Sequence, residues 1–347
     1  MYFCRRKDLL HFLLRLSMKL VKMKNTALAI GFIAFVLSAS TFAYMIEAET
    51  FETWFNSLYF VLTTMATVGY GDYSPSTFPG KVLTIFIYVF GIGLLSLVIG
   101  KIIDAVADFN RRREAGRLRY QGKNHVIIVN WSKKAQYAIE EILSTDPNIE
   151  VVIIDEIDKH PYDKPKIHFI SGDPSSIDIL EQADIKNARS AIVFADARID
   201  EPALVDGKSL LLASTIESIA PKVHTTVEIM MEKHIQNFKH VKVNDFVLSH
   251  DAVSRLAVRS ALNEGSLDIF TQLLSRQKGA DVYHVTIRPE WKTYEDAFLA
   301  LIKQGATLVS NKSDMTINTK LNQPIPTDAK LFAICDGEVY KKINNVV

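Results

Sequence analysis

Several features that would place a protein in a familiar soluble class are missing from this chain of 347 residues. It has only two cysteines, Cys4 and Cys335, at opposite ends, which excludes a disulfide scaffold and a clustered zinc site. Its formal net charge is only +1, which argues against a dedicated nucleic-acid-binding protein. Disorder is excluded as well, because 48% of the residues are hydrophobic and the net charge is small.

Lysine and arginine are missing altogether from the segment between Glu47 and Gly80. This segment separates two long uncharged stretches, residues 26–46 and 82–100, each long enough to cross a hydrocarbon core of about 30 Å as a helix. Cationic residues precede the first stretch and follow the second. The sequence therefore predicts a multi-pass plasma (inner) membrane protein with both termini in the cytoplasm and the acidic connection outside.

Residues 1–25 precede the first span and alternate leucines with cationic side chains. Two interpretations stay open. The segment is either an amphipathic helix that lies along the inner leaflet, in contact with lipid, or a simple positively charged tail that orients the spans.

The connection between the spans is too apolar for an ordinary loop. Residues 53–64 are apolar and aromatic but too short to span, which is typical of a re-entrant half-helix. The sequence Thr67-Val68-Gly69-Tyr70-Gly71-Asp72 follows. Rings of backbone carbonyls from four such segments can replace the hydration shell of K⁺, and the two glycines permit the positive φ angles that this requires. We expect the threonine hydroxyl to form the innermost oxygen ring, with the tyrosine and the aspartate bracing the filter.

This segment resembles the signature sequence of potassium channels, and the two flanking spans resemble their minimal two-helix pore. The resemblance implies a homotetramer, because one copy supplies only a quarter of a filter. It also implies a gating hinge in the second span at about Gly93, for which Gly91 is a second candidate, with Ser96 lining the pore. Small-residue packing is the alternative role for the glycines.

After the spans, segments rich in β-branched residues alternate with helical patterns. The predicted strands cover residues 125–130, 151–156, 167–173, 190–196, 223–230 and 245–251. Such buried runs predict a parallel, doubly wound, Rossmann-like α/β domain. The G-x-G-x-x-G phosphate motif is missing, and Asn130-Trp131-Ser132 occupies its place. Asp155 and Asp173, at the ends of the second and third strands, are candidate nucleotide contacts, and Asp155 is equally well explained as a carboxylate that caps the next turn.

A two-helix pore followed by this domain resembles the RCK (regulator of potassium conductance, TrkA-N-like) channels. In that family a ring of eight domains pulls on the inner helices when it binds a ligand. In calcium-gated members, acids of the fourth and fifth strands bind the ion, and Asp196 and Glu228 match those places. Met230 replaces a further acid, which weakens the case for a divalent site.

The remainder of the chain forms a third region. The apolar face of residues 252–276 predicts dimerisation helices or internal packing, and the rest predicts a small α+β lobe with strands in 280–287 and 330–337. We therefore expect an N-terminal segment (1–25), an α-helical pore domain (26–108), a linker (109–123), a Rossmann-like RCK lobe (124–251), and dimerisation helices with a C-terminal lobe (252–347). No methionine lies between Met65 and Met230, so additional RCK domains for an octameric ring need another source than an internal methionine start.

The sequence predicts a K⁺-selective channel, not an enzyme, whose cytoplasmic ring opens or closes the gate on binding a regulatory divalent cation or a nucleotide. A soluble nucleotide-binding subunit of a potassium uptake transporter is one alternative, and the two spans argue against it. A membrane-anchored NAD-dependent oxidoreductase is another, and the missing glycines and catalytic pair argue against it.

Overall fold

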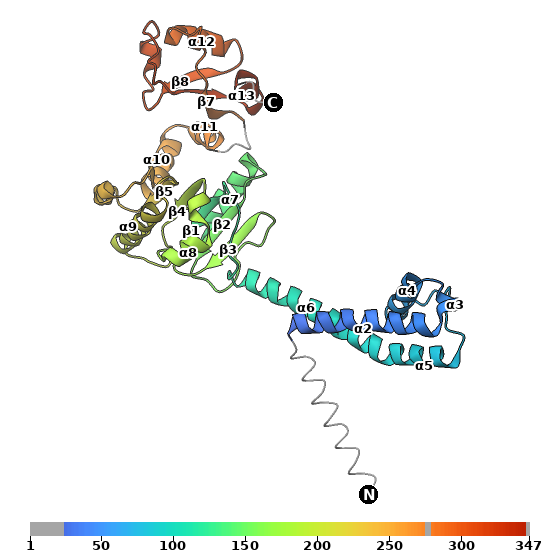
Figure 1. Ribbon diagram of the computed structural model, residues 1–347. Helices are drawn as coiled ribbons and strands as arrows, with labels where there is room; N and C mark the ends of the chain where they lie inside the picture. The colour runs from blue at the N-terminus through green and yellow to red at the C-terminus, as the bar shows by residue number, and fades with distance from the viewer. Residues whose placement is uncertain (1–23, 275–278, 345–347) are drawn as a thin grey trace. The chain divides into compact units, whose positions relative to one another are not determined.

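The computed structural model describes residues 24–274 and 279–344, and the chain divides into two compact units (Figure 1). The first unit runs through Arg112 and contains helices but no strand where described; it is called the helical unit. The second begins at Arg113 and is called the α/β unit. The predicted N-terminal amphipathic helix lies outside the described residues, apart from its last two positions.

The helical unit contains two helices long and apolar enough to span a membrane. The first is α2 (Asn25–Ile46), and the second is continuous over 78–114. The second comprises α5 (Phe78–Phe86), a π-helical turn η1 (Ile87–Gly91) and α6 (Ile92–Glu114). Between the spans lie a short α3 (Ala48–Phe51) and the half-helix α4 (Trp54–Met65). The two long apolar helices and the short helix between them, which the sequence predicts, are therefore present.

The pore helix and the spans share one small core. Val36 and Ala39 of α2, Val61 and Met65 of α4, and Ile87 of η1 are buried together. Many other apolar side chains of the spans stay exposed within the single chain, among them Ile30, Ile33, Val89 and Phe90. Surfaces of this kind are stable in lipid or against further subunits rather than in water.

The α/β unit is built on a six-stranded parallel sheet in the order β3-β2-β1-β4-β5-β6. Its strands are β1 (Val126–Val129), β2 (Val151–Asp155), β3 (Ile167–Ser171), β4 (Ser190–Val193), β5 (His224–Ile229) and β6 (Asp245–Leu248). The first two strands are buried along their whole length, as helices on both faces of a parallel sheet require. This is the predicted Rossmann-like arrangement.

Helices cover the two faces of the sheet through two separate cores. Ala135 and Ile139 of α7 (Lys133–Thr145) pack on one face, against alternate residues of β1 and β2. Leu180 of α8 (Ile177–Gln182) and Leu212 of α9 (Pro202–Ile219) pack on the other. Short 3₁₀ turns, η2 (Ile185–Asn187) and η3 (Glu232–His240), complete the connections.

The last predicted strand is shorter than expected, because residues 249–251 already belong to a helix. That helix, α10 (Ser249–Leu262), is followed by α11 (Ser266–Leu273). Gly265 lies in the left-handed region with φ 80° and separates the two helices, so the predicted long helical stretch is two helices. Neither helix has a buried residue within the chain.

The C-terminal lobe has a three-stranded antiparallel sheet in the order β7-β9-β8. Strands β7 (Asp281–Val285) and β9 (Leu331–Cys335) fall in the predicted segments. The strand β8 (Thr307–Asn311) was not predicted, because its TLVSN sequence is short and half polar. The lobe is completed by α12 (Tyr294–Ile302), η4 (Ile317–Thr319) and α13 (Gly337–Asn344), and its core includes Trp291, Ala297 and Leu331.

The predicted linker at residues 109–123 differs from the structure at its first half. Helix α6 continues through Glu114, where Arg112 and Asp108 form an (i, i+4) ion pair of 2.8 Å that favours the helix. Residues 114–120 then lie against the sheet of the α/β unit, as described below.

Candidate functional site: a filter segment and the carboxyl edge of the sheet

The half-helix α4 presents its carboxyl end to the signature segment. The Thr53 side chain accepts a hydrogen bond from the Asn56 N–H and caps the helix at its start. At its end, the Thr63 carbonyl accepts the N–H groups of Val68 (2.9 Å) and Gly69 (3.3 Å). The negative end of the helix dipole is thus directed at the segment, and a cation is favoured there.

The backbone of the signature segment alternates in handedness. The φ angles are positive at Thr67 (60°), Gly69 (52°) and Gly71 (80°), whereas Val68 and Tyr70 are not among the residues with positive φ. Apart from the adjacent residues, no described heavy atom lies within 4 Å of where a Cβ would project at either glycine, so their requirement for glycine is conformational. Alternation of this kind can turn successive carbonyls toward one axis.

Aromatic side chains support the outer part of the segment. The Tyr70 ring stacks on the Tyr59 ring of α4, with centroids 6.4 Å apart and 3° between the planes. Tyr73 meets the same Tyr59 ring edge-on at 6.4 Å. Asp72 Oδ1 accepts the Tyr73 N–H at 3.1 Å. The rings of Tyr70 and Tyr73 therefore support the segment against α4.

A second support, which the sequence did not reveal, is the buried carboxylate of Glu47. Its Oε1 accepts hydrogen bonds from the Thr77 N–H (2.7 Å) and hydroxyl (2.6 Å), and its Oε2 accepts the Thr50 hydroxyl (2.8 Å) and the Ser76 hydroxyl (3.3 Å). Burial opposes ionisation, but these hydrogen bonds outweigh it and lower the pKa of Glu47 to about 2. The end of α2 is thereby fixed to the start of α5, directly after the filter segment.

The two glycines of the second span differ in their surroundings. A Cβ on Gly91 would lie 2.8 Å from Cγ of Met65, so this glycine permits a close contact with the pore helix. A Cβ on Gly93 would meet nothing within 4 Å among the described residues. Gly91 also ends the π-helical turn, a feature that often accompanies functional bends. The Ser96 hydroxyl donates to the Ile92 carbonyl at 2.8 Å.

The residues predicted to contact a nucleotide lie at the carboxyl edge of the parallel sheet. The Asp155 carboxylate is almost fully buried and accepts the N–H groups of Trp131 (2.7 Å) and Glu156 (2.6 Å). Ser132 caps α7, and Asp173 Oδ1 accepts the Ser175 N–H and hydroxyl within its own loop. These groups are occupied by local hydrogen bonds, so a ribose would have to displace the bonds that Asp155 makes.

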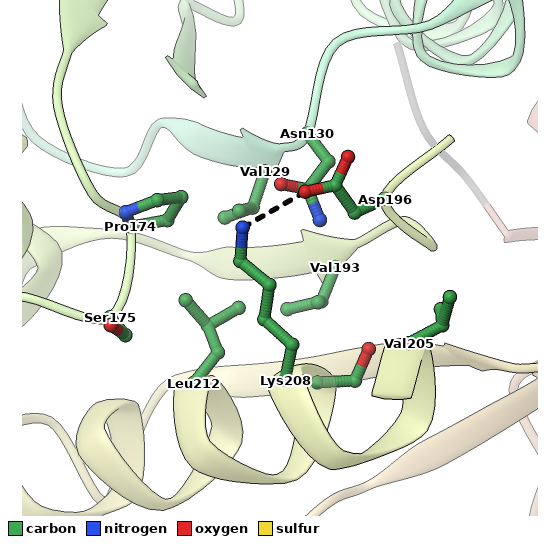
Figure 2. A pocket seen from close by; sticks show the side chains of 10 residues that line it. Val129, Asn130, Pro174, Ser175, Val193, Asp196, Val205, Lys208 and Leu212 are labelled. Atoms are coloured by element: carbon green, nitrogen blue, oxygen red, sulfur yellow. Dashed lines mark hydrogen bonds and ion pairs between the residues drawn. The ribbon is translucent and has the colours of Figure 1, made fainter. Parts of the chain in front are cut away.

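Asn130 is the exception in this group. It has a positive φ of 66° and is buried, and its Nδ2 donates to the Phe194 carbonyl at 2.6 Å. Its Oδ1 is buried and has no hydrogen-bond partner in the part of the chain that the structure describes. Figure 2 shows Asn130 above a small pocket lined by Asp196 and Lys208, with about 260 Å³ of space that includes its open mouth.

Asp196, a candidate metal ligand, is paired with two cations of the chain. Its carboxylate accepts Nε and Nη2 of Arg198 (2.8 and 2.9 Å) and Nζ of Lys208 (2.9 Å; Figure 2). Burial opposes its ionisation, but the two cations lower its pKa well below the usual range. Arg198 also reaches Asp155 at 2.8 Å and so links the ends of β2 and β4.

Glu228, the second candidate ligand, also has a cation of its own. Oε1 pairs with Nζ of Lys134 at 2.5 Å, and Oε2 accepts the Ala195 N–H at 2.9 Å. Burial raises the pKa of Glu228, yet the Lys134 and Ser249 hydrogen bonds keep it below the ordinary value. Within residues 24–274 and 279–344, no three His, Cys, Asp or Glu side chains are grouped so as to hold a metal ion. The sequence singled out the acids but not their cationic partners, which lie up to 94 residues away.

Comparisons with known proteins divide the chain in the same way. Residues 31–108 match the ion channel family, and residues 126–250 match the TrkA-N domain family. The putative potassium channel protein YugO of Bacillus subtilis is 26% identical over 213 residues, 61% of this chain and 64% of that protein. The calcium-gated potassium channel TvoK of Thermoplasma volcanium is 27% identical over 276 residues, 77% of this chain and 78% of that protein.

A solved structure, the human SLO3 gating ring, shares the fold. It has a TM-score of 0.50 and 11% identity, and the likeness covers 63% of this chain and 46% of that one. The fold and the site together define an ion-channel domain followed by a Rossmann-like TrkA-N domain. The chain has the architecture of the potassium channels that carry an RCK domain.

Proposed function

We propose that this chain is the subunit of a homotetrameric, K⁺-selective channel of the plasma membrane whose filter is formed by residues 67–72. The observation that carries the proposal is the alternation of positive φ at Thr67, Gly69 and Gly71, at the carboxyl end of a half-helix between two spans. Backbone carbonyls arranged in this way around an axis replace the water lost by K⁺. Four chains are needed, because one segment forms only one wall of a pore.

The proposal is tested by ion selectivity in reconstituted liposomes or bilayers. Gly69→Ala and Gly71→Ala force an L side chain into the left-handed region, and each should abolish selective K⁺ conduction. Gly31→Ala is a matched control, since a Cβ there meets nothing within 4 Å and its backbone is helical. Unchanged permeability of K⁺ over Na⁺ in either filter variant would overturn the assignment.

The α/β unit acts in this proposal as a cytoplasmic gating domain that controls opening of the inner helix near Gly91 and Gly93. Assembly with neighbouring copies is supported by α10 and α11, whose apolar residues are exposed in the single chain, including Val253, Val258 and Leu262. Exposed apolar surfaces of this extent favour association. Whether four or eight such domains form the ring is measurable from the mass of the purified assembly.

The regulatory ligand is a divalent cation or a nucleotide that binds at the carboxyl edge of the sheet. The relative TvoK is calcium-gated, and Asp196 and Glu228 supply buried carboxylates of the kind such ions prefer. Each carboxylate already holds a lysine or arginine, so a divalent cation must displace ion pairs before it binds. A nucleotide would bind over Asn130-Trp131-Ser132, beside the small pocket that Asn130 lines.

Potassium flux from liposomes distinguishes these ligands. Calcium chloride, magnesium chloride, ATP, ADP and NAD are added separately to the side that faces the α/β unit. A ligand that changes flux only in channels retaining this unit identifies the regulatory class. Lack of response to every one of them would contradict ligand control at this edge.

A further inference from the structure

The segment that joins the inner helix to the sheet is held by hydrogen bonds along its whole first half. The His160 N–H donates to the Glu114 carbonyl (2.8 Å), and the Ser171 N–H donates to the Gly116 carbonyl (3.1 Å). The His168 ring Nε2 lies 2.8 Å from the Leu118 carbonyl. These donors belong to β3 or to the loop before it. The edge of the sheet therefore binds every second carbonyl of the segment, from Glu114 to Leu118.

Side chains add to this attachment from both ends. The Arg113 guanidinium pairs with Asp163 at 2.5 Å. The Tyr120 N–H donates to the Gln182 carbonyl (3.0 Å), and its hydroxyl donates to Glu150 (2.5 Å). The Tyr120 ring is buried between two imidazoles, with centroids 4.4 Å from His125 and 5.5 Å from His168. A free tether would expose these groups to water.

Gly116 makes the close approach possible. Its φ is +64°, and a Cβ at this position would overlap the Ser171 backbone nitrogen and lie 2.8 Å from the Phe169 ring. Any other residue there must both adopt the left-handed region and move β3 away. Glycine is therefore required for the contact between the segment and the sheet.

We infer that residues 114–120, called the anchor segment, are the point at which the α/β unit holds the inner helix, with Gly116 and His168 as positioning residues for gating. The inference rests on the proposed function of gating by this unit. A displacement of the sheet is then transmitted to α6 at Glu114, and residues 121–124 take no part in this transmission. Tyr120 and Gln182 close the segment at its far end.

Two insertions in the full-length channel test where the load is transmitted. Gly-Ser-Gly between Arg111 and Arg112 precedes the anchor segment, and the same insert between Gly122 and Lys123 follows it. Open probability in bilayers without added ligand should change at least about fivefold for the first insert, the lower end of ordinary coupling, and stay unchanged for the second. If the connection that transmits displacement extended through residue 123, both inserts would change open probability equally. That result would overturn the inference.

Point variants separate gating from folding. Gly116→Ala should alter open probability as the upstream insert does, whereas Gly207→Ala, where a Cβ meets nothing within 4 Å, should not. His168→Gln retains an N–H donor for the Leu118 carbonyl and should keep normal gating, whereas His168→Ala should not. Unitary conductance and K⁺ over Na⁺ permeability stay constant in all of them, because the filter is untouched. Normal gating in Gly116→Ala or His168→Ala would contradict the assignment.

Hydrogen exchange of the full-length protein in detergent is independent of conduction. The amides of His160, Ser171 and Tyr120 should exchange as slowly as those of the buried strand β1. Rapid exchange at these amides would overturn the anchor while the channel proposal stands. Slow exchange in a protein that conducts no K⁺ would instead show that the channel proposal fails.

Discussion

The Glu47 carboxylate bonds to both the N–H and the hydroxyl of Thr77, at 2.7 and 2.6 Å, across 30 residues of sequence. Glu47 directly follows α2, and Thr77 caps the helix that follows the filter segment. The half-helix and the filter segment therefore lie between Glu47 and Thr77, two residues that the buried Glu47 carboxylate joins. These hydrogen bonds fix the end of α2 to the start of α5.

Removal of this carboxylate should destabilise the helical unit. Glu47→Ala leaves the Thr77 N–H without its buried partner, at an expected cost of about 2–4 kcal/mol. Glu47→Gln keeps one acceptor and should cost less. The measurement is thermal unfolding of the purified protein in detergent, with Glu49→Ala as control because Glu49 is exposed. Equal midpoints for the Glu47 and Glu49 alanine variants would contradict this role.

Substitution of Gly80 should destabilise the helical unit through the same Glu47 contact. A Cβ there would overlap Oε1 of Glu47 and lie 2.8 Å from Cβ of Pro75. Gly80→Ala is therefore expected to displace the carboxylate and to lower the unfolding midpoint about as much as Glu47→Ala. The double variant should be little worse than either single one, because both remove the same contact. Full additivity of the two effects would disprove the shared contact.

Alanine substitutions at Gly91 and Gly93 should distinguish a packing role from a hinge role in the second long helix. Gly91→Ala places a Cβ against Met65 and should destabilise the helical unit by about 1–3 kcal/mol, as overpacking does. Gly93→Ala meets nothing in the chain and should leave the unfolding midpoint unchanged. If Gly93 is the hinge, its alanine variant lowers open probability in bilayer recordings. Normal opening in Gly93→Ala would show that Gly93 is not the hinge and would favour the π-helical turn that ends at Gly91.

Lys134 should determine the response of the α/β unit to calcium. Its ammonium group pairs with buried Glu228, so Lys134→Met leaves that carboxylate free for another cation. We expect a lower unfolding midpoint for this variant and a partial recovery in millimolar calcium chloride. Lys133→Met is the matched control, since the Lys133 ammonium group donates to the Gln136 side chain (3.2 Å) instead of a buried carboxylate. Absence of any calcium effect in Lys134→Met, beside a response in the unsubstituted protein, would contradict the prediction.

Three histidines around the anchor segment should make the α/β unit sensitive to acid. Burial lowers the pKa values of His125, His160 and His168 below 6.5. The unfolded chain therefore binds more protons, and stability is constant above about pH 6.5 and falls as the pH drops below it. The charged groups facing them are Arg113, Glu150, Asp163 and Asp184.

The test is the unfolding midpoint of the full-length protein between pH 7 and 5. His168→Gln removes one titrating group and should reduce the slope by up to about 1.4 kcal/mol per pH unit. His240→Gln, at an exposed position, should not change it. A midpoint that is flat over this range would show that the histidines are not linked to folding.

Much of this architecture could be predicted from local sequence. The two long apolar helices follow from uncharged runs, and all six strands of the parallel sheet lie within the predicted ranges, four of them with both ends within two residues of the predicted bounds. The filter at residues 67–72 stays a prediction. The strand β8 could not be predicted, because TLVSN has no run of β-branched residues and owes its place to pairing with β9. The extension of α6 to Glu114 was missed because its charged residues are typical of a linker.

The sequence by itself determined which segments are apolar and where the strands of the parallel sheet lie, and it predicted the filter at residues 67–72. Only the tertiary structure decided the partners of the buried charges: Glu47 with Thr77, Asp155 and Asp196 with Arg198, and Glu228 with Lys134. The glycine at position 116 likewise has a reason only when Ser171 is beside it. Local patterns fix burial and backbone conformation, whereas a charge pair depends on which distant segments the fold brings to one edge of a sheet.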